Sequence, residues 1–179
     1  MNKKTTFWGK RLLYTINMVF ARAEKAQKPR SEAAKIVAWV YAAILVIMLV
    51  GQLVAFENFT PLIYTNYISN HTYGAASLLA GILVFTELFA LPFLLRMKLS
   101  PLMRWFSIFC GNFAAFTWLY IVVAPVDGTP VGTNSGMFGT DVTMPIGVVA
   151  TVFGYVLLAL AIYTSRGLWP VHKKLARKK

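Results

Sequence analysis

Four long runs of apolar residues constrain this chain more than any other feature. They cover residues 36–56, 75–95, 105–123 and 146–163. A helix of about 20 residues is long enough to cross the hydrocarbon core of a bilayer, which is roughly 30 Å thick. The composition agrees, because 58% of the 179 residues are hydrophobic and only 13% are charged. The sequence therefore predicts an all-α integral membrane protein built as a four-helix transmembrane bundle.

The runs divide the chain into a basic cytoplasmic arm (1–35), a transmembrane domain (36–163) and a basic cytoplasmic tail (164–179). Between Trp8 and Ala23, apolar residues recur with a helical period opposite Lys and Arg. This pattern predicts an N-terminal amphipathic helix lying in the membrane interface. Such a helix serves either as a lipid anchor or as a docking surface for a partner.

Local signals predict where two of the spanning helices begin. Ser31 follows a break at Pro29, and serine is a preferred residue at the start of a helix, so we expect Ser31 to cap the first span. Proline is favoured in the first turn of a helix, so we expect Pro145 there in the fourth span.

The basic residues predict the orientation of the bundle. All 18 Lys and Arg residues precede the first span, follow the fourth, or lie near the turn between the second and third. Cytoplasmic loops are enriched in Lys and Arg, so both termini are expected in the cytoplasm. Small size and the lack of sorting signals favour a prokaryotic cytoplasmic membrane.

The net charge of +12 follows from this topology and from attraction to anionic lipids. It does not indicate nucleic-acid binding, because the charges flank spans and are not gathered in one folded basic domain. The residues expected to contact lipid head groups are Lys10, Arg11, Arg22, Arg96, Lys98, Arg104, Lys173 and Lys174.

Several chemistries lack the residues they require. Cys110 is the single cysteine and lies within the third span, so no intramolecular disulfide is possible and a small buried residue is expected. His71 and His172 lie outside the spans, so no histidine is placed to ligate a buried haem. No metal site and no cofactor are expected, and no nucleophile or phosphate-loop motif is present. A self-sufficient enzyme is therefore not favoured.

Glu87 is the one acidic residue inside a predicted span. It lies roughly 12 Å from the cytoplasmic end at 1.5 Å per residue, and a carboxylate at that depth is costly. Asn112 and Tyr155 reach a similar depth in the third and fourth spans, so the three residues could form one polar layer. That layer is either a proton, cation or quinone site, or a set of hydrogen bonds that joins helices. Gln52 lies nearer the outer face and is interpreted as a helix-packing residue.

Other residues are assigned to packing, to the loops or to the interface. Small residues spaced by four, such as Ser77 with Gly81, predict close helix contacts. Residues 57–74 are expected to fold back over the bundle as a short helix, and residues 124–144, rich in turn formers, to form an exposed irregular loop. The predicted interfacial anchors are Trp39, Tyr41, Trp105, Tyr163 and Trp169.

The order of these features resembles the small four-helix DoxX-like membrane proteins over residues 36–123. The resemblance rests on the stretch GILVFTELFA at residues 81–90, the short basic turn LRMKL at residues 95–99, and the spans around them. It implies that Glu87 matches a family glutamate and that partners belong to respiratory or thiol-redox systems. The basic arm and the Gly- and Thr-rich second outer loop depart from the family pattern.

Taken together, these patterns predict a non-catalytic accessory or interaction subunit of a membrane complex. Its expected partners are a bilayer with anionic lipids and either another membrane protein or a second copy of the chain. The alternative is a small transporter or proton-coupled redox component that uses Glu87.

Overall fold

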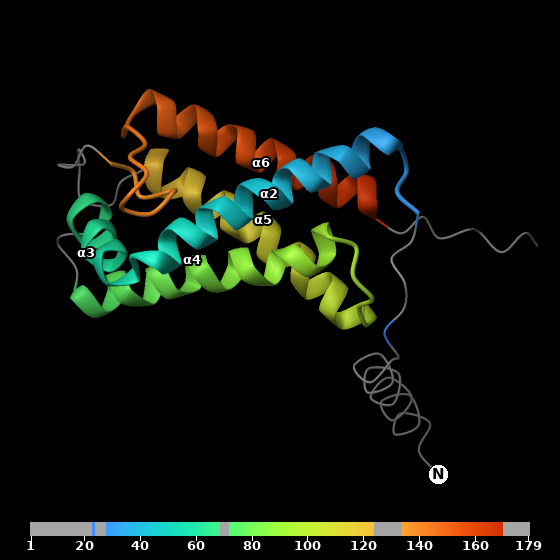
Figure 1. Ribbon diagram of the computed structural model, residues 1–179, viewed down its shortest axis with the longest axis horizontal. Helices are drawn as coiled ribbons and strands as arrows, with labels where there is room; N and C mark the ends of the chain where they lie inside the picture. Colours follow the sequence, from blue (N-terminus) through green and yellow to red (C-terminus); the bar gives the residue numbers. More distant parts are fainter. Residues whose placement is uncertain (1–22, 24–27, 69–71, 124–133, 170–179) are drawn as a thin grey trace, which may run out of the picture.

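The computed structural model describes residue 23 and residues 28–68, 72–123 and 134–169 (Figure 1). Five helices lie in these ranges, and an isolated antiparallel bridge pairs Asn134 with Pro145. The predicted amphipathic helix of the N-terminal arm lies outside the described residues. The helices are α2 (Glu32–Val54), α3 (Phe56–Tyr67), α4 (Tyr73–Leu94), α5 (Pro101–Val123) and α6 (Val148–Leu168).

Four of these helices, α2, α4, α5 and α6, are long and apolar enough to cross a membrane. They contain 21 to 23 residues each, and the mean hydropathy of their most apolar windows lies between 1.7 and 2.4. The prediction of an all-helical chain with four candidate spans is confirmed, and it indicates a multi-pass membrane protein. Helices α2, α5 and α6 also include polar residues outside the apolar runs that predicted them.

The start of α2 is as predicted, but the start of α6 is not. The Ser31 hydroxyl accepts a hydrogen bond from the backbone N–H of Ala34 at 3.1 Å, which caps α2. Pro145, in contrast, pairs with Asn134, and α6 begins at Val148 after Gly147, whose φ is +101°. The prediction for Pro145 is therefore wrong, because the glycine turn delays the helix by three residues.

Small residues allow the long helices to pack closely. Helix α5 contacts α4 and α6, and α2 contacts the same two helices. A Cβ at Gly111 would lie 3.4 Å from the Ala90 side chain, and one at Gly154 would lie 3.2 Å from Leu119. These two positions support the predicted close approach. Gly81 does not, since a Cβ there meets no described atom of another segment within 4 Å.

One end of the bundle is closed by α3 and residues 134–147, which lie together in Figure 1. Phe59, Ile63 and Tyr67 on α3 are fully buried, so the prediction that this segment folds back as a short helix is confirmed. The expectation of an exposed second loop is wrong for residues 134–139, where Ser135 and Met137 are fully buried, and it holds for residues 141–143, which are exposed. We call α3 and residues 134–147 the outer cap.

Two glycines bring the outer cap into backbone contact with α2. A Cβ at Gly51 would overlap the carbonyl oxygen of Phe138, and one at Gly139 would overlap the carbonyl of Gly51. Gly139 also has a φ of +82°, which side chains rarely adopt. The cap can therefore reach α2 only because both positions lack a side chain.

Replacing Gly51 by alanine tests this approach. The added Cβ must displace the Phe138 carbonyl, so we expect a loss of about 1–3 kcal/mol in stability, measured as a lower thermal unfolding midpoint in mild detergent. The control is Gly81→Ala, because that position is open and alanine favours a helix over glycine. Equal midpoints for the two variants would contradict the close approach.

Candidate functional site

The candidate site is centred on the Glu87 side chain, which α4 holds in the interior with no exposed surface. Its Oε1 accepts a hydrogen bond from the indole N–H of Trp118 on α5 at 2.7 Å. The same oxygen accepts a second bond from the Gln52 amide on α2 at 3.2 Å. One carboxyl oxygen therefore joins three of the four long helices. We call Glu87, Gln52 and Trp118 the carboxyl cluster.

Gln52 also connects the carboxyl cluster to the outer cap. Its Nε2 donates a second hydrogen bond, to the backbone carbonyl of Met137 at 3.1 Å. The Phe59 ring of α3 lies against the Trp118 ring, with centroids 6.4 Å apart. Both parts of the cap thus touch the cluster.

Two oxygens of the cluster are buried and accept no hydrogen bond from the described residues: Glu87 Oε2 and Gln52 Oε1. Buried polar atoms are nearly always paired in proteins. A proton on Glu87 Oε2 would convert that atom into a donor, while Oε1 keeps its bonds from the Gln52 amide and the Trp118 indole. The arrangement is therefore compatible with a neutral carboxylic acid.

The outer cap has its own hydrogen bonds. The Tyr67 hydroxyl donates to the carbonyl of Ser135 at 2.9 Å, and the Asn66 amide donates to the carbonyl of Asn134 at 2.8 Å. Burial raises the pKa of Tyr67 above its usual value, so its hydroxyl keeps its proton and remains a donor. The Asn134 Oδ1 accepts from the N–H groups of Gly136 and Met144. These bonds hold the cap against the bundle.

The structure separates the three residues of the predicted polar layer. Asn112 donates to the Ser165 hydroxyl on α6 at 2.7 Å and to the carbonyl of Ile108 at 2.8 Å. Tyr155 is 56% exposed on the outside of α6. Among the described residues, no hydrogen bond joins either side chain to Glu87. Of the three, Glu87 alone belongs to the carboxyl cluster.

Sequence reasoning assigned Gln52 to simple helix packing and did not single out Trp118. A signal for Trp118 was present, because an indole N–H inside an apolar helix needs an acceptor and Glu87 is the one carboxylate inside the predicted apolar runs. Tyr41 was interpreted as an interfacial anchor, but it is buried and its hydroxyl donates to the carbonyl of Gly111 at 2.7 Å. Trp39 and Trp105, each 57% exposed, are accessible as an anchor requires.

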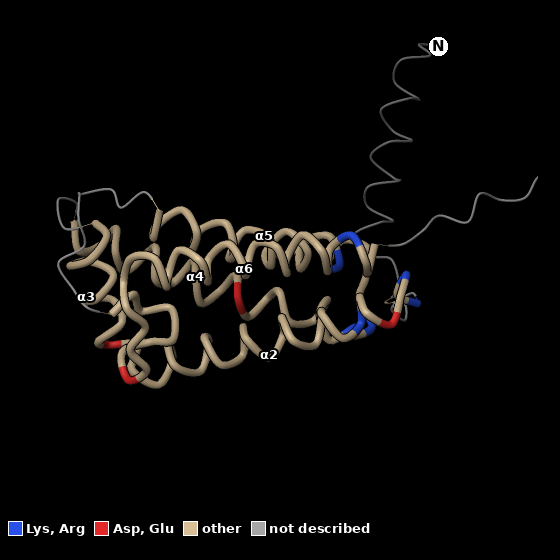
Figure 2. Tube along the Cα trace, turned by 90° about the horizontal axis from the view of Figure 1, so that it is seen from above, with Lys and Arg blue, Asp and Glu red and all other residues tan. Residues whose placement is uncertain are grey.

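The described Lys and Arg residues gather at the end of the bundle opposite the outer cap (Figure 2). Three predicted lipid contacts, Arg96, Lys98 and Arg104, lie at the α4–α5 turn or in the first turn of α5. The other five predicted contacts, Lys10, Arg11, Arg22, Lys173 and Lys174, lie outside the described residues. Within the described ranges, no group of three His, Cys, Asp or Glu side chains could hold a metal ion.

Comparisons of the chain with family models, curated proteins and solved structures found no match. The resemblance to DoxX-like proteins therefore stays a prediction, and functional inference rests on the carboxyl cluster and on the charge distribution.

Replacing Trp118 by phenylalanine tests the shorter bond to Glu87. The change removes the indole donor from a buried acceptor, and we expect a cost of about 1–3 kcal/mol. Helical circular dichroism followed against temperature in mild detergent measures the loss. Trp39→Phe is the matched control, since it makes the same chemical change at an exposed side chain. A midpoint for Trp118→Phe no lower than that of the control would show that the bond adds no stability.

Proposed function

We propose that the protein is a non-catalytic accessory or interaction subunit of a complex in a prokaryotic cytoplasmic membrane. The observation that carries this proposal is the arrangement around Glu87, the one buried acidic residue of the candidate spans, since Glu32 is exposed at the first residue of α2. Its side chain is fully buried and one oxygen bonds to two other helices. A carboxyl group held in this way stabilises helix association and is not presented to a substrate.

The remaining polar side chains of the candidate spans support the same interpretation. Asn112 bonds to Ser165 across α5 and α6, and Ser107 donates to the carbonyl of Phe89 across α5 and α4. Thr86 and Thr164 bond to carbonyls within their own helices. These groups form hydrogen bonds within the bundle, as expected for a subunit with a structural role. A partner from a respiratory or thiol-redox system, as the DoxX-like resemblance implies, is part of this proposal.

The proposed orientation places the basic end of the bundle, and both termini, in the cytoplasm. Near this end lie the start of α2, the α4–α5 turn and the end of α6, with the described Lys and Arg residues. Asp141 lies near the opposite end, in the outer cap, where the described segments contain no Lys or Arg. This asymmetry is typical of membrane proteins that keep their basic loops inside the cell.

Single cysteines labelled by a membrane-impermeant maleimide test the orientation. In a Cys110→Ala background, the exposed positions Lys98 and Asp141 are each replaced by cysteine. We expect Asp141→Cys to be labelled on intact spheroplasts and Lys98→Cys to be labelled only after permeabilisation. The reverse pattern would place the termini outside and overturn the proposed topology.

The second candidate function is a small transporter or a proton-coupled redox component. It is favoured by Glu87 Oε2 and Gln52 Oε1, two buried oxygens that accept no hydrogen bond from the described residues. A carboxyl group can gain and lose a proton at an oxygen that no donor occupies. In this case ionisation of Glu87 would be part of the activity. In an accessory subunit ionisation would not matter.

Replacing Glu87 by glutamine separates the two functions. Glutamine keeps the size of the side chain and an oxygen that accepts from Trp118 and Gln52, but it cannot ionise. We expect the variant to fold, to co-purify in mild detergent with the same membrane proteins as the wild type, and to leave the activity of that complex unchanged. Assembly of a complex without activity would favour the proton-coupled component.

A further inference from the structure

A second polar feature lies at the basic end of the bundle, far from the carboxyl cluster. It is a cavity of about 510 Å³ between the segment before α2, the first turn of α2 and the α4–α5 turn. Four basic side chains line this cavity, namely Lys28, Arg30, Lys35 and Arg96, together with one carboxylate, Glu32. The charged groups therefore sum to +3.

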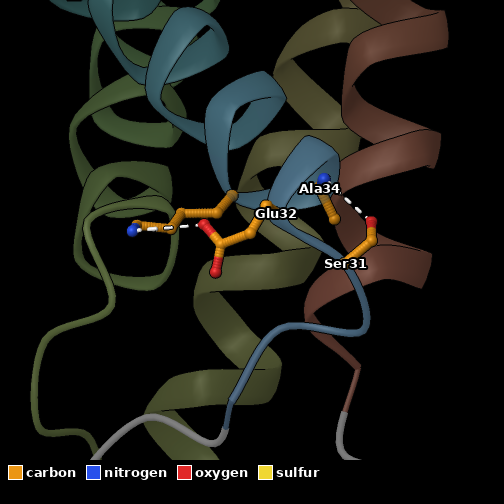
Figure 3. A network of polar contacts seen from close by, with 4 residues as sticks. Ser31, Glu32 and Ala34 are labelled. Carbon is orange, nitrogen blue, oxygen red and sulfur yellow. Dashed lines mark hydrogen bonds and ion pairs between the residues drawn. The ribbon is translucent and has the colours of Figure 1, made fainter.

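Glu32 neutralises little of this charge. Its Oε2 lies 3.4 Å from the Lys35 ammonium, but the Glu32 side chain is 81% exposed. Exposed ion pairs are weak because water screens them. Figure 3 shows this pair beside the Ser31 cap, at the point where α2 begins. The N-terminal end of a helix carries partial positive charge, which adds to the attraction for an anion.

The backbone fixes the positions of two of the cations. The N–H of Arg30 donates to the carbonyl of Gly167 at 3.0 Å, which ties the segment before α2 to the end of α6. Arg96 follows α4, where its N–H donates to Phe93 and the N–H of Met97 donates to Pro92. These two bonds form the C-terminal motif in which glycine usually fills the left-handed position.

In this chain the left-handed position is filled by Arg96, with a φ of +57°. A side chain in this conformation is uncommon and costs free energy. Arg96 is among the residues that line the basic cavity.

A second, smaller cavity of about 340 Å³ shares Arg30 and Ser31 with the first and extends between α2 and α6. Arg166 and the half-exposed ring of Tyr163 line it, together with Ala34. The two cavities thus place cations beside an apolar groove between two candidate spans. Membrane proteins hold anionic lipids in this way, with the lipid phosphate against cations and the acyl chain against an apolar groove.

We propose that this pair of cavities is a specific site for an anionic phospholipid, with its phosphate held by Arg30, which lines both cavities. Arginine suits this role because its planar group can donate two parallel hydrogen bonds to phosphate. The proposal rests on the proposed placement of this end at the inner membrane surface. It differs from diffuse attraction to an anionic surface, to which any basic residue at this end would contribute equally.

The test is native mass spectrometry of the delipidated full-length protein with added phosphatidylglycerol or phosphatidylcholine. We expect phosphatidylglycerol to bind more tightly, and Arg30→Gln to weaken its binding about tenfold, as expected for loss of a hydrogen bond to a charged group. Lys98→Gln is the comparison for diffuse attraction, because Lys98 is an expected head-group contact at the same end of the chain but lines neither cavity. We expect that variant to weaken binding much less than Arg30→Gln does.

Three results would overturn the proposal. Equal losses in Arg30→Gln and Lys98→Gln would show diffuse attraction, and equal binding of the two lipids would show no preference for an anion. Displacement of phosphatidylglycerol by millimolar inorganic phosphate would assign the cavity to free phosphate in place of lipid. Circular dichroism confirms that each variant is folded. None of these measurements depends on a partner complex, so failure here and failure of the accessory role are distinguishable.

Discussion

The pair of hydrogen bonds on Glu87 Oε1 is the interaction on which the rest of the bundle depends. Apolar helices have little hydrophobic reason to choose one partner over another inside lipid, so packing and hydrogen bonds decide which faces meet. Trp118 and Gln52 bring α5 and α2 to one point on α4. Since Gln52 also holds the carbonyl of Met137, the same point fixes the cap at the end of the bundle.

The two ends of the bundle differ in the interactions that their residues make. At the capped end, segments approach until backbone meets backbone at Gly51 and Gly139, and buried amides and hydroxyls bond to carbonyls. At the basic end, described Lys and Arg residues line two cavities beside the same helices. Among the described residues, cations are thus concentrated at one end, and backbone contacts with buried polar bonds at the other.

The helices could be predicted from the sequence because their information is local. Apolar runs long enough to cross a bilayer, together with the Ser31 cap, predicted helices whose bounds differ by a few residues from those observed. Glu87 could be recognised as unusual for the same reason. Its partners could not, since all four long helices are apolar on every side and give no sign of which face points inward. Depth along a helix placed Asn112 and Tyr155 beside Glu87, whereas rotation about the helix axis separates them.

The sequence distances within the carboxyl cluster have a consequence for biosynthesis. Gln52 precedes Glu87 by 35 residues, and Trp118 follows Glu87 by 31. In a chain that enters the bilayer one span at a time, Glu87 is inserted after Gln52. Trp118, the donor of the shorter bond, is synthesised later. An acidic group alone at the bilayer centre costs about 2.5–3.5 kcal/mol to insert. An amide one span earlier offsets part of that cost, so the first two spans gain by entering lipid as a hairpin.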